Sequence, residues 1–443
     1  MGKTKYASKK FSDELLSFLD RSPNAFFVID NLKKELKKAG FSAVTTADSE
    51  KIRPGGCYFF TRNESSLIAV RIPEKEPTGF RMLASHADSP TFKIKVNAEI
   101  EVEKRYLTLN TEKYGGMILS SWLDRPLSVA GRVIVRTKTG VASRLINIDR
   151  DLLVIPNLAI HMDRKLNDGY VYNAQNDLLP LFGDQDTENS FQKLVAKEAG
   201  VEADDILETD LFLYNRTKAS LFGANREYIG SGRLDDLQCV FASLKGLLPC
   251  TPLDGIAVHA VFDNEEVGSR TKQGAAGTFL TDVLHCVGRG LGWNEDALQK
   301  AYQNSLLISA DNAHAVHPNR LDKADPTNRP YLNGGIVIKY NADQKYTTDA
   351  VSAGLFRLIC EKAEVPCQTY VNRSDIPGGS TLGNLAAAHL PVNMVDIGLP
   401  QLAMHSAWET AGVKDTEYLI KAASAFFSSS LVQNGEGEYE LHW

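Results

Sequence analysis

Residues 255–270 read GIAVHAVFDNEEVGSR, and this stretch joins an apolar segment to an acidic end. The apolar run 255–262 is followed at once by Asp263, Glu265 and Glu266. A short apolar run that ends in polar residues is typical of a strand inside a sheet. Adjacent glutamates in extended backbone point to opposite sides, so we expect one of them to reach solvent and the other to need a partner or a function.

Strands and helices alternate on both sides of this stretch, which predicts an α/β fold with a mixed sheet. An amphipathic helix is expected from Asn24, a capping residue, to Gly40, a stop signal. We expect strands at 55–60, 66–72, 80–90, 305–311, 367–372 and 392–398, a helix at 349–363, and a closing helix at 416–431.

The sequence pattern changes between Ile94 and Gly223, where it predicts mostly short strands and turns, and only 188–200 looks clearly helical. A chain of 443 residues also exceeds the size at which one core usually stops growing. We therefore predict a first part of an α/β domain at 1–93, an inserted β-rich domain at 94–223, and the second part of the α/β domain at 224–443.

The composition excludes several classes of protein. Hydrophobic residues make up 43% and charged residues 23%, and the net charge is −6, so we expect no nucleic-acid partner. No run of apolar residues is long enough to span a membrane, and the basic start lacks the apolar core of a signal peptide. The six cysteines contain no C-x-x-C pair, which favours reduced thiols and a cytoplasmic protein.

Five segments at expected strand ends carry imidazoles and carboxylates but no thiols. They are SHADSP with His86 and Asp88, LDDL with Asp235 and Asp236, DNEEVG with Glu265 and Glu266, SADNAHAVHPN with Asp311, His314 and His317, and AMHSAWET with His405. Such a set suits a hydrolytic zinc site, and a two-metal site needs a bridging carboxylate. Taken singly, each histidine also fits a buried core position, and Asp235 or Asp236 fits a helix cap.

These motifs, together with PGGSTLG at 377–383, closely resemble in the same order those of the aspartyl aminopeptidase family of di-zinc exopeptidases. The resemblance implies an α/β peptidase domain interrupted by a β-rich dimerisation domain, and dimers assembled into a dodecamer. It also implies that the chain is a metallo-aminopeptidase that releases the N-terminal residue of peptides by means of a metal-bridging water.

The resemblance also implies a role for each matching residue. Two divalent ions, zinc first with cobalt or manganese as alternatives, would be held by His86 and Asp311 on one side and by Glu266 and His405 on the other. Asp235 would bridge them, a choice over Asp236 that rests on the motif alone. Glu265 would be the general base, and Asp88 would orient His86 through its second nitrogen.

The substrate residues follow from the same resemblance. Family members favour an N-terminal Asp or Glu, for which Lys339 and His314 are the candidate partners, although Asn333 and glycines stand where another basic residue is expected. His161 would reach into the active site of the partner subunit. Two alternatives stay open at this stage: a di-zinc deacylase with the same ligands, and a non-catalytic scaffold of the same fold.

Overall fold

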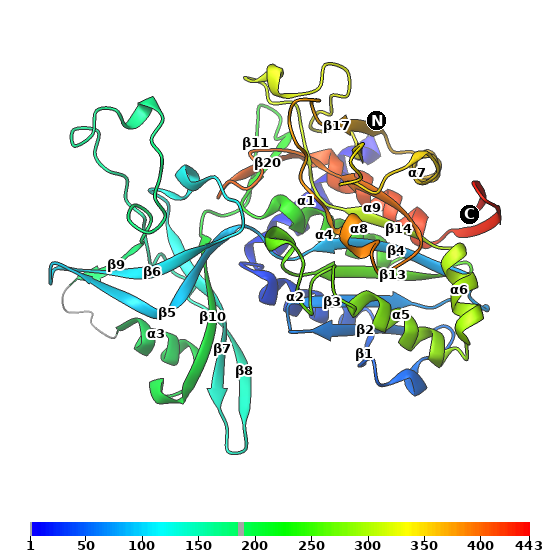
Figure 1. The fold of residues 1–443 in the computed structure, drawn as a ribbon, viewed down its shortest axis with the longest axis horizontal. Coiled ribbons are helices and arrows are strands. Elements are labelled where there is room, and N and C mark those ends of the chain that lie inside the picture. The colour runs from blue at the N-terminus through cyan, green and yellow to red at the C-terminus, as the bar shows by residue number, and fades with distance from the viewer. Residues whose placement is uncertain (1, 185–189) are drawn as a thin grey trace.

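The computed structural model describes residues 2–184 and 190–443, and a nine-stranded mixed sheet forms the core of its larger part, on the right in Figure 1. Its strands lie in the order β1-β2-β3-β13-β4-β14-β18-β16-β17. Their bounds are β1 Ser42–Ala43, β2 Cys57–Arg62, β3 Ser66–Arg71, β4 Gly79–His86, β13 Gly255–Phe262, β14 Leu306–Ala310, β16 Ile336–Tyr340, β17 Cys367–Val371 and β18 Asn393–Gly398. The predicted α/β class with a mixed sheet is confirmed.

The three central strands β13, β4 and β14 run parallel and end at the same edge of the sheet. The register pairs Gly255 with Gly79 at one end and Phe262 with His86 at the other. Every residue of β13 is buried, as expected for the apolar run. Because ligands bind at the carboxyl ends of parallel strands, this edge is where a site is expected.

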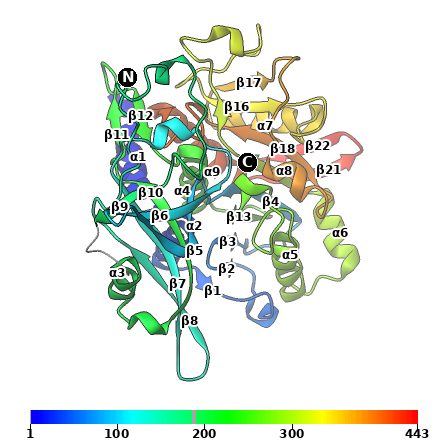
Figure 2. The same cartoon turned by 60° about the vertical axis from the view of Figure 1, so that its left-hand side comes forward.

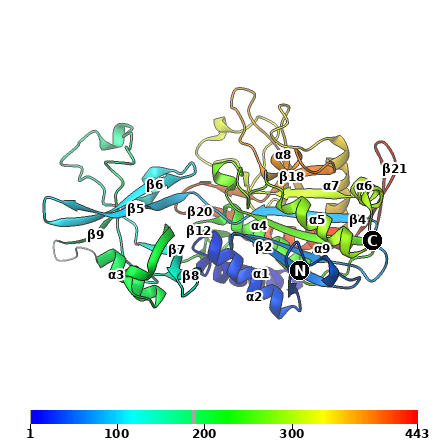
Figure 3. The same ribbon diagram turned by 60° about the horizontal axis from the view of Figure 1, so that its bottom comes forward.

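Helices cover both faces of the central sheet (Figure 3). One hydrophobic cluster packs α1, α2, α4, α7 and α9 against one face, and a second packs α5, α6 and α8 against the other. Their bounds are α1 Gly2–Asp20, α2 Ala25–Lys38, α4 Leu234–Leu247, α5 Phe279–Gly290, α6 Glu295–Gln303, α7 Ala350–Lys362, α8 Leu382–Ala386 and α9 Val413–Phe427. This layering encloses the strands and leaves their ends accessible.

The helix expected after Asn24 forms as predicted. The Asn24 side chain accepts a hydrogen bond from the Phe27 amide at 3.4 Å, and Val28, Leu32 and Leu36 face the core. The side-chain acceptor satisfies one of the amide groups that a helix start leaves without a partner.

A six-stranded antiparallel sheet lies beside the central sheet and is built from residues 91–215 (Figure 2). Its strands are β5 Thr91–Val102, β6 Tyr106–Tyr114, β7 Leu127–Arg136, β8 Val141–Asn147, β9 Leu181–Asp184 and β10 Ile206–Asn215. β7 and β8 form a hairpin around residues 137–140. The expected helix appears as α3 Ser190–Ala199, while residues 188 and 189 of that expectation lie outside the described residues.

Two smaller sheets complete the fold. One contains β11 Ser220–Phe222, β12 Tyr228–Ser231, β15 Ala313–His314, β19 Pro400–Leu402 and β20 Glu409–Gly412. The other is a hairpin of β21 Ser430–Gly435 and β22 Glu438–His442. The expectation that a helix closes the chain was therefore wrong, because this hairpin follows α9 and buries Leu431. Across the described ranges, none of the helices has the length and apolarity that crossing a membrane requires.

Candidate metal centre

Three of the predicted ligands leave adjacent parallel strands at the same edge of the central sheet. His86 is the last residue of β4, Glu266 follows β13, and Asp311 comes directly after β14. Asp235 stands at the start of α4, and His405 lies in the loop between β19 and β20. The structure thus brings together all five residues that the sequence named as metal ligands.

The five side chains divide into two sets that share Asp235. One set is His86, Asp235 and Asp311, and the other is Asp235, Glu266 and His405. Asp235 Oδ1 lies 3.3 Å from His86 Nε2, while Asp235 Oδ2 lies 3.4 Å from His405 Nε2. The remaining contacts are Glu266 Oε2 to His405 Nε2 at 3.2 Å and Asp311 Oδ1 to His86 Nε2 at 3.8 Å.

Both histidines are oriented by a backbone carbonyl. His86 Nδ1 lies 3.0 Å from the Asp88 carbonyl oxygen, and His405 Nδ1 lies 2.7 Å from the Gly116 carbonyl oxygen. A carbonyl only accepts, so each Nδ1 carries a proton and each Nε2 faces the carboxylates, where a neutral ring would offer its lone pair to a metal ion. A cation between Nε2 and the carboxylates satisfies both lone pairs.

The buried oxygens of the cluster support the same conclusion. Asp235 Oδ1, Asp236 Oδ1 and Glu266 Oε1 are buried and accept no hydrogen bond from any residue that the structure describes. Buried carboxylate oxygens without a hydrogen bond are costly unless a metal or a cation neutralises them. An ion held by four ligands at about 2.1 Å keeps them about 3.4 Å apart, close to the observed separations. The residues therefore fit divalent metal ions with nitrogen and oxygen ligands.

The acidic turn after β13 differs from the expected extended segment. Glu265 and Glu266 lie in a 3-10 turn, Glu265–Val267, which follows Asn264 in the left-handed region at φ 62°. Both glutamate side chains consequently reach the cluster around His86 instead of pointing to opposite sides. Burial, together with the nearby Asp311 and Asp88 charges, raises the pKa of Glu265 to about 8. Bound divalent cations lower the pKa of a neighbouring acid.

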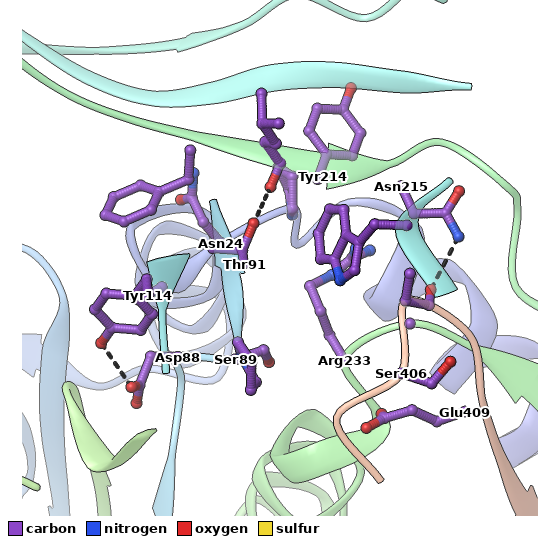
Figure 4. A pocket seen from close by; sticks show the side chains of 18 of the residues that line it. Asn24, Asp88, Ser89, Thr91, Tyr114, Tyr214, Asn215, Arg233, Ser406 and Glu409 are labelled. Atoms are coloured by element: carbon purple, nitrogen blue, oxygen red, sulfur yellow. Dashed lines mark hydrogen bonds between the residues drawn. The ribbon is translucent and has the colours of Figure 1, made fainter. Parts of the chain in front are cut away.

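The Asp88 carboxylate holds this acidic turn in place. It accepts hydrogen bonds from the amides of Glu265 at 3.1 Å and Glu266 at 3.2 Å, and from the Tyr114 hydroxyl at 2.7 Å (Figure 4). It was expected to orient His86, but its oxygen is 3.4 Å from Nδ1, whereas the carbonyl of the same residue is 3.0 Å away. The carboxylate therefore holds the two glutamates and also lies near His86 Nδ1, so its role in orienting His86 stays a prediction.

Three supporting residues were not assigned from the sequence. Glu409 accepts hydrogen bonds from the Asp235 amide at 3.1 Å and the His405 amide at 2.7 Å, and burial, followed by the Asp235 charge, raises its pKa to about 8. Asp236 Oδ2 accepts from the His86 amide at 3.1 Å, and Tyr114 comes from β6. Asp88, Tyr114 and Glu409 also border a second cavity, which Figure 4 shows from close by. Glu409 belongs to the MHSAWET motif, which was the only available signal.

A cavity of about 320 Å³ opens in front of the cluster. Glu265 and both predicted substrate residues, His314 and Lys339, border it. The residues that line it also include Tyr346, Tyr370, Gly379, Ser380 and Thr381. Such a pocket beside a hydrolytic centre is the natural place for a substrate.

The two predicted substrate residues differ in their surroundings. Lys339 Nζ donates to the Asp311 carbonyl oxygen at 2.8 Å and lies 3.5 Å from Asp311 Oδ2. Burial by itself lowers the pKa of Lys339, but the Asp311 charge outweighs it and the pKa is raised. His314 is exposed on β15, and its ring centroid lies 6.0 Å from that of Tyr370.

His161 belongs to neither cluster and does not border this cavity. It is an exposed residue in the connection between β8 and β9, beside the second sheet. Its neighbours are apolar and unusually exposed, with Met162 at 76% and Ile160 at 43%. Within one chain, the structure does not bring His161 to the centre.

Parallel strands that deliver nitrogen and oxygen ligands to one edge, with a glutamate facing the adjacent pocket, define a metal-dependent hydrolase. Residues 18–427 match the model of the family described as aminopeptidase I zinc metalloprotease (M18). The chain belongs to this family and is a metallo-aminopeptidase.

Proteins with related sequences agree with the family match. The chain is 45% identical over 427 residues to a probable M18 family aminopeptidase 2 of Clostridium novyi (strain NT), covering 95% of this chain and 99% of that protein. It is 42% identical over 424 residues to the protein of the same description from Pseudomonas aeruginosa (strain UCBPP-PA14), covering 94% and 97%.

Solved structures show the same fold. Ape4, in a cryo-EM structure of its complex with Nbr1, has a TM-score of 0.93 at 36% identity, over 96% of this chain and 87% of that chain. The mApe1 of Chaetomium thermophilum has a TM-score of 0.86 at 30% identity, over 95% and 98%.

Proposed function

We propose that the protein releases the N-terminal residue of peptides with two divalent ions per chain. His86 and Asp311 hold one ion, Glu266 and His405 hold the other, and Asp235 bridges them. The supporting observation is that the two oxygens of Asp235 face different histidines, at 3.3 and 3.4 Å. Zinc is the first candidate because the family is one of zinc metalloproteases, while cobalt and manganese use similar ligands.

Glu265 is the proposed general base. It borders the pocket, and its backbone is held through Asp88. Zinc, when bound at such a centre, polarises a carbonyl and lowers the pKa of water toward about 7. Glu265 accepts the proton of the attacking water and then returns it to the leaving amine, so one carboxylate serves both steps.

The pocket in front of the cluster would hold the N-terminal side chain of the substrate. Lys339 is a charged group on its border, which supports a preference for Asp or Glu. His314 is a second candidate partner, and desolvation in the pocket, together with the Lys339 charge, lowers its pKa, so it would act as a neutral hydrogen-bonding group. Because Lys339 already donates to Asp311, it would act on a substrate carboxylate more through its positive charge than as a free hydrogen-bond donor.

Assembly is the remaining part of the proposal. We infer that 94–223 is a dimerisation domain, between the two parts 1–93 and 224–443 of the peptidase domain, and that His161 acts in the partner subunit. Exposed apolar residues around His161 support a contact there. A structure of the S. cerevesiae mApe1 is described as a dodecamer, which supports the same assembly for this chain. All six cysteines are free thiols, in keeping with a cytoplasmic protein.

An assay of aminoacyl chromogenic substrates with varied N-terminal residues tests the function. Release of the N-terminal residue that stops on chelation and returns with zinc, cobalt or manganese is expected. Release of an acyl group instead of an amino acid would favour a deacylase, and absence of hydrolysis with any metal would favour a scaffold.

A further inference from the structure

Asp396 is a buried carboxylate on β18 that the chemistry described above does not use. Its side chain has no exposed surface, and no lysine, arginine or histidine within the described ranges forms an ion pair with it, although its charge acts on Lys339 from a distance. A buried carboxylate in such a position must be stabilised by hydrogen bonds. The hydrogen bonds that it accepts come from two segments that are far apart in the sequence.

The first of these segments is 345–349. Thr347 donates twice to Asp396 Oδ2, from its amide at 2.6 Å and from its hydroxyl at 2.7 Å. The residue before it, Tyr346, is buried and borders the substrate pocket. The segment leads directly into α7, whose start is fixed by a capping box between Asp349 and Ser352.

The second segment is 379–383. Thr381 Oγ1 donates to Asp396 Oδ1 at 2.5 Å, and Thr381 itself borders the pocket together with Gly379 and Ser380. The two oxygens of one carboxylate thus hold two segments that contribute Tyr346, Gly379, Ser380 and Thr381 to the pocket lining. Hydrogen bonds to a charged acceptor are stronger than those between neutral groups, so this connection resists displacement.

Gly383 shows how closely the two segments meet. A Cβ at this position would lie 2.9 Å from Asp396 Oδ2 and 3.0 Å from Thr347 Oγ1. Both separations are too short for ordinary contact, so only glycine lets the second segment approach the carboxylate. A methyl group here would displace the hydroxyl of Thr347 or the carboxylate.

We propose that Asp396 is a positioning residue for substrate binding, which sets the pocket wall of Tyr346 and Thr381 through its hydrogen bonds to Thr347 and Thr381. It touches neither the metal ligands nor the general base. The proposal rests on the proposed use of this pocket for the N-terminal side chain. Loss of the hydrogen bonds to Asp396 should therefore raise KM and change the preference between substrates, with less effect on kcat and metal content.

The test uses hydroxyl removals that preserve shape. Thr347→Val and Thr381→Val each remove one donor to Asp396, and each should raise KM about tenfold, since a hydrogen bond to a charged group is lost. The value of kcat and the number of bound metal ions should stay unchanged. Thr381→Ser keeps the hydroxyl and should therefore have the same KM as the wild type. Gly383→Ala should raise KM in the same way.

Thr369→Val is the matched control. Thr369 lies on β17 next to Tyr370, but its hydroxyl accepts from Arg357 and not from any group near Asp396. It should leave KM unchanged. Hydrogen–deuterium exchange supplies a readout besides activity: segments 345–349 and 379–383 should exchange faster in Thr381→Val than in Thr369→Val.

The outcomes separate this proposal from the function itself. A wild-type enzyme that is active, with Thr347→Val and Thr381→Val behaving like Thr369→Val in KM and exchange, would overturn the positioning role alone. Equal losses of kcat and metal in the two valine variants would also overturn it, because they would point to general damage. A wild-type protein without aminopeptidase activity would instead contradict the proposed function.

Discussion

The carboxylate of Asp235 turns one oxygen to His86 and the other to His405, at 3.3 and 3.4 Å from their Nε2 atoms. If this carboxylate bridges two ions, then Asp235→Asn should lower the occupancy of both sites, whereas His405→Ala should lower mainly one. Elemental analysis of purified protein checks this, with the exposed His317→Ala as control. One ion or none per chain in active wild-type protein would contradict the bridging role.

Glu265→Gln should retain both metal ions and the fold but lose about 100- to 10,000-fold in kcat, since it removes the proton acceptor while keeping the shape. Glu266→Gln should lower metal occupancy instead. Steady-state kinetics and metal analysis of the two variants, measured side by side, distinguish the general base from the metal ligand. The opposite pattern, with an active Glu265→Gln and a metal-replete but inactive Glu266→Gln, would mean that the two roles are exchanged.

Removal of the Tyr114 hydroxyl should have a smaller effect. Tyr114→Phe takes one of three donors from Asp88 but leaves the amides of Glu265 and Glu266. We expect kcat/KM to fall about tenfold with both metals bound, as for other groups that orient a metal centre. Asp88→Asn should cost more, because an amide nitrogen would face one of those backbone donors. Full activity in Asp88→Asn would refute the importance of this contact.

His161→Ala should leave metal content and assembly intact and lower kcat/KM about 100-fold if His161 supplies a donor to the reacting group of the neighbouring chain. Mixed assemblies of His161→Ala and Glu265→Gln chains should regain part of the activity, because some pairs combine an intact Glu265 with an intact His161. Chains shown to have exchanged without any recovery would exclude action between subunits. Normal activity of His161→Ala alone would make it an ordinary surface histidine.

His259 predicts an acid-dependent loss of stability away from the site. It is fully buried on β13, and its Nδ1 contacts Ser243 Oγ at 2.9 Å. Burial lowers its pKa to about 3, below the value of about 6.5 in an unfolded chain. The neutral ring is favoured in the fold, so its contribution is full above about pH 6.5 and is lost as the pH falls toward 3.

The free energy of unfolding should therefore drop by on the order of 2 kcal/mol between about pH 7 and about pH 5 through this group alone. Denaturant unfolding of wild type and of His259→Asn at both pH values gives the change in the free energy of unfolding for each protein, and the difference between the two changes is the contribution of His259. Equal pH slopes in the two proteins would show that His259 does not contribute.

The sequence predicted the large features of the fold because their signals are local. The apolar run before Asp263 and the cap at Asn24 each depend on neighbouring residues only. The final hairpin was missed because β21 and β22 are short and follow a strong helical pattern. Its stability comes from packing against the central core, which no local pattern reports.

The metal centre shows the same division between features with a local sequence signal and features that depend on long-range contacts. His86, Asp311 and Glu266 follow from strand ends, and motif resemblance added their roles. Tyr114 contacts Asp88, 26 positions away, and Glu409 contacts Asp235, 174 positions away, besides its neighbour His405, so spacing in the sequence did not reveal their roles. The 3-10 turn at Glu265 is held by the hydrogen bonds that the amides of Glu265 and Glu266 donate to the Asp88 carboxylate. These contacts exist only in the folded chain, so the sequence does not show them.

The carbonyl that fixes His405 belongs to Gly116, just beyond the last strand residue of β6, and Tyr114 of that strand supports Asp88. A shortened enzyme made by excising residues 91–215 would thus lose two supports of its own catalytic centre, even as a monomer. The second sheet is part of the minimal unit of activity. Attempts to miniaturise the protein should therefore leave β6 and Gly116 intact.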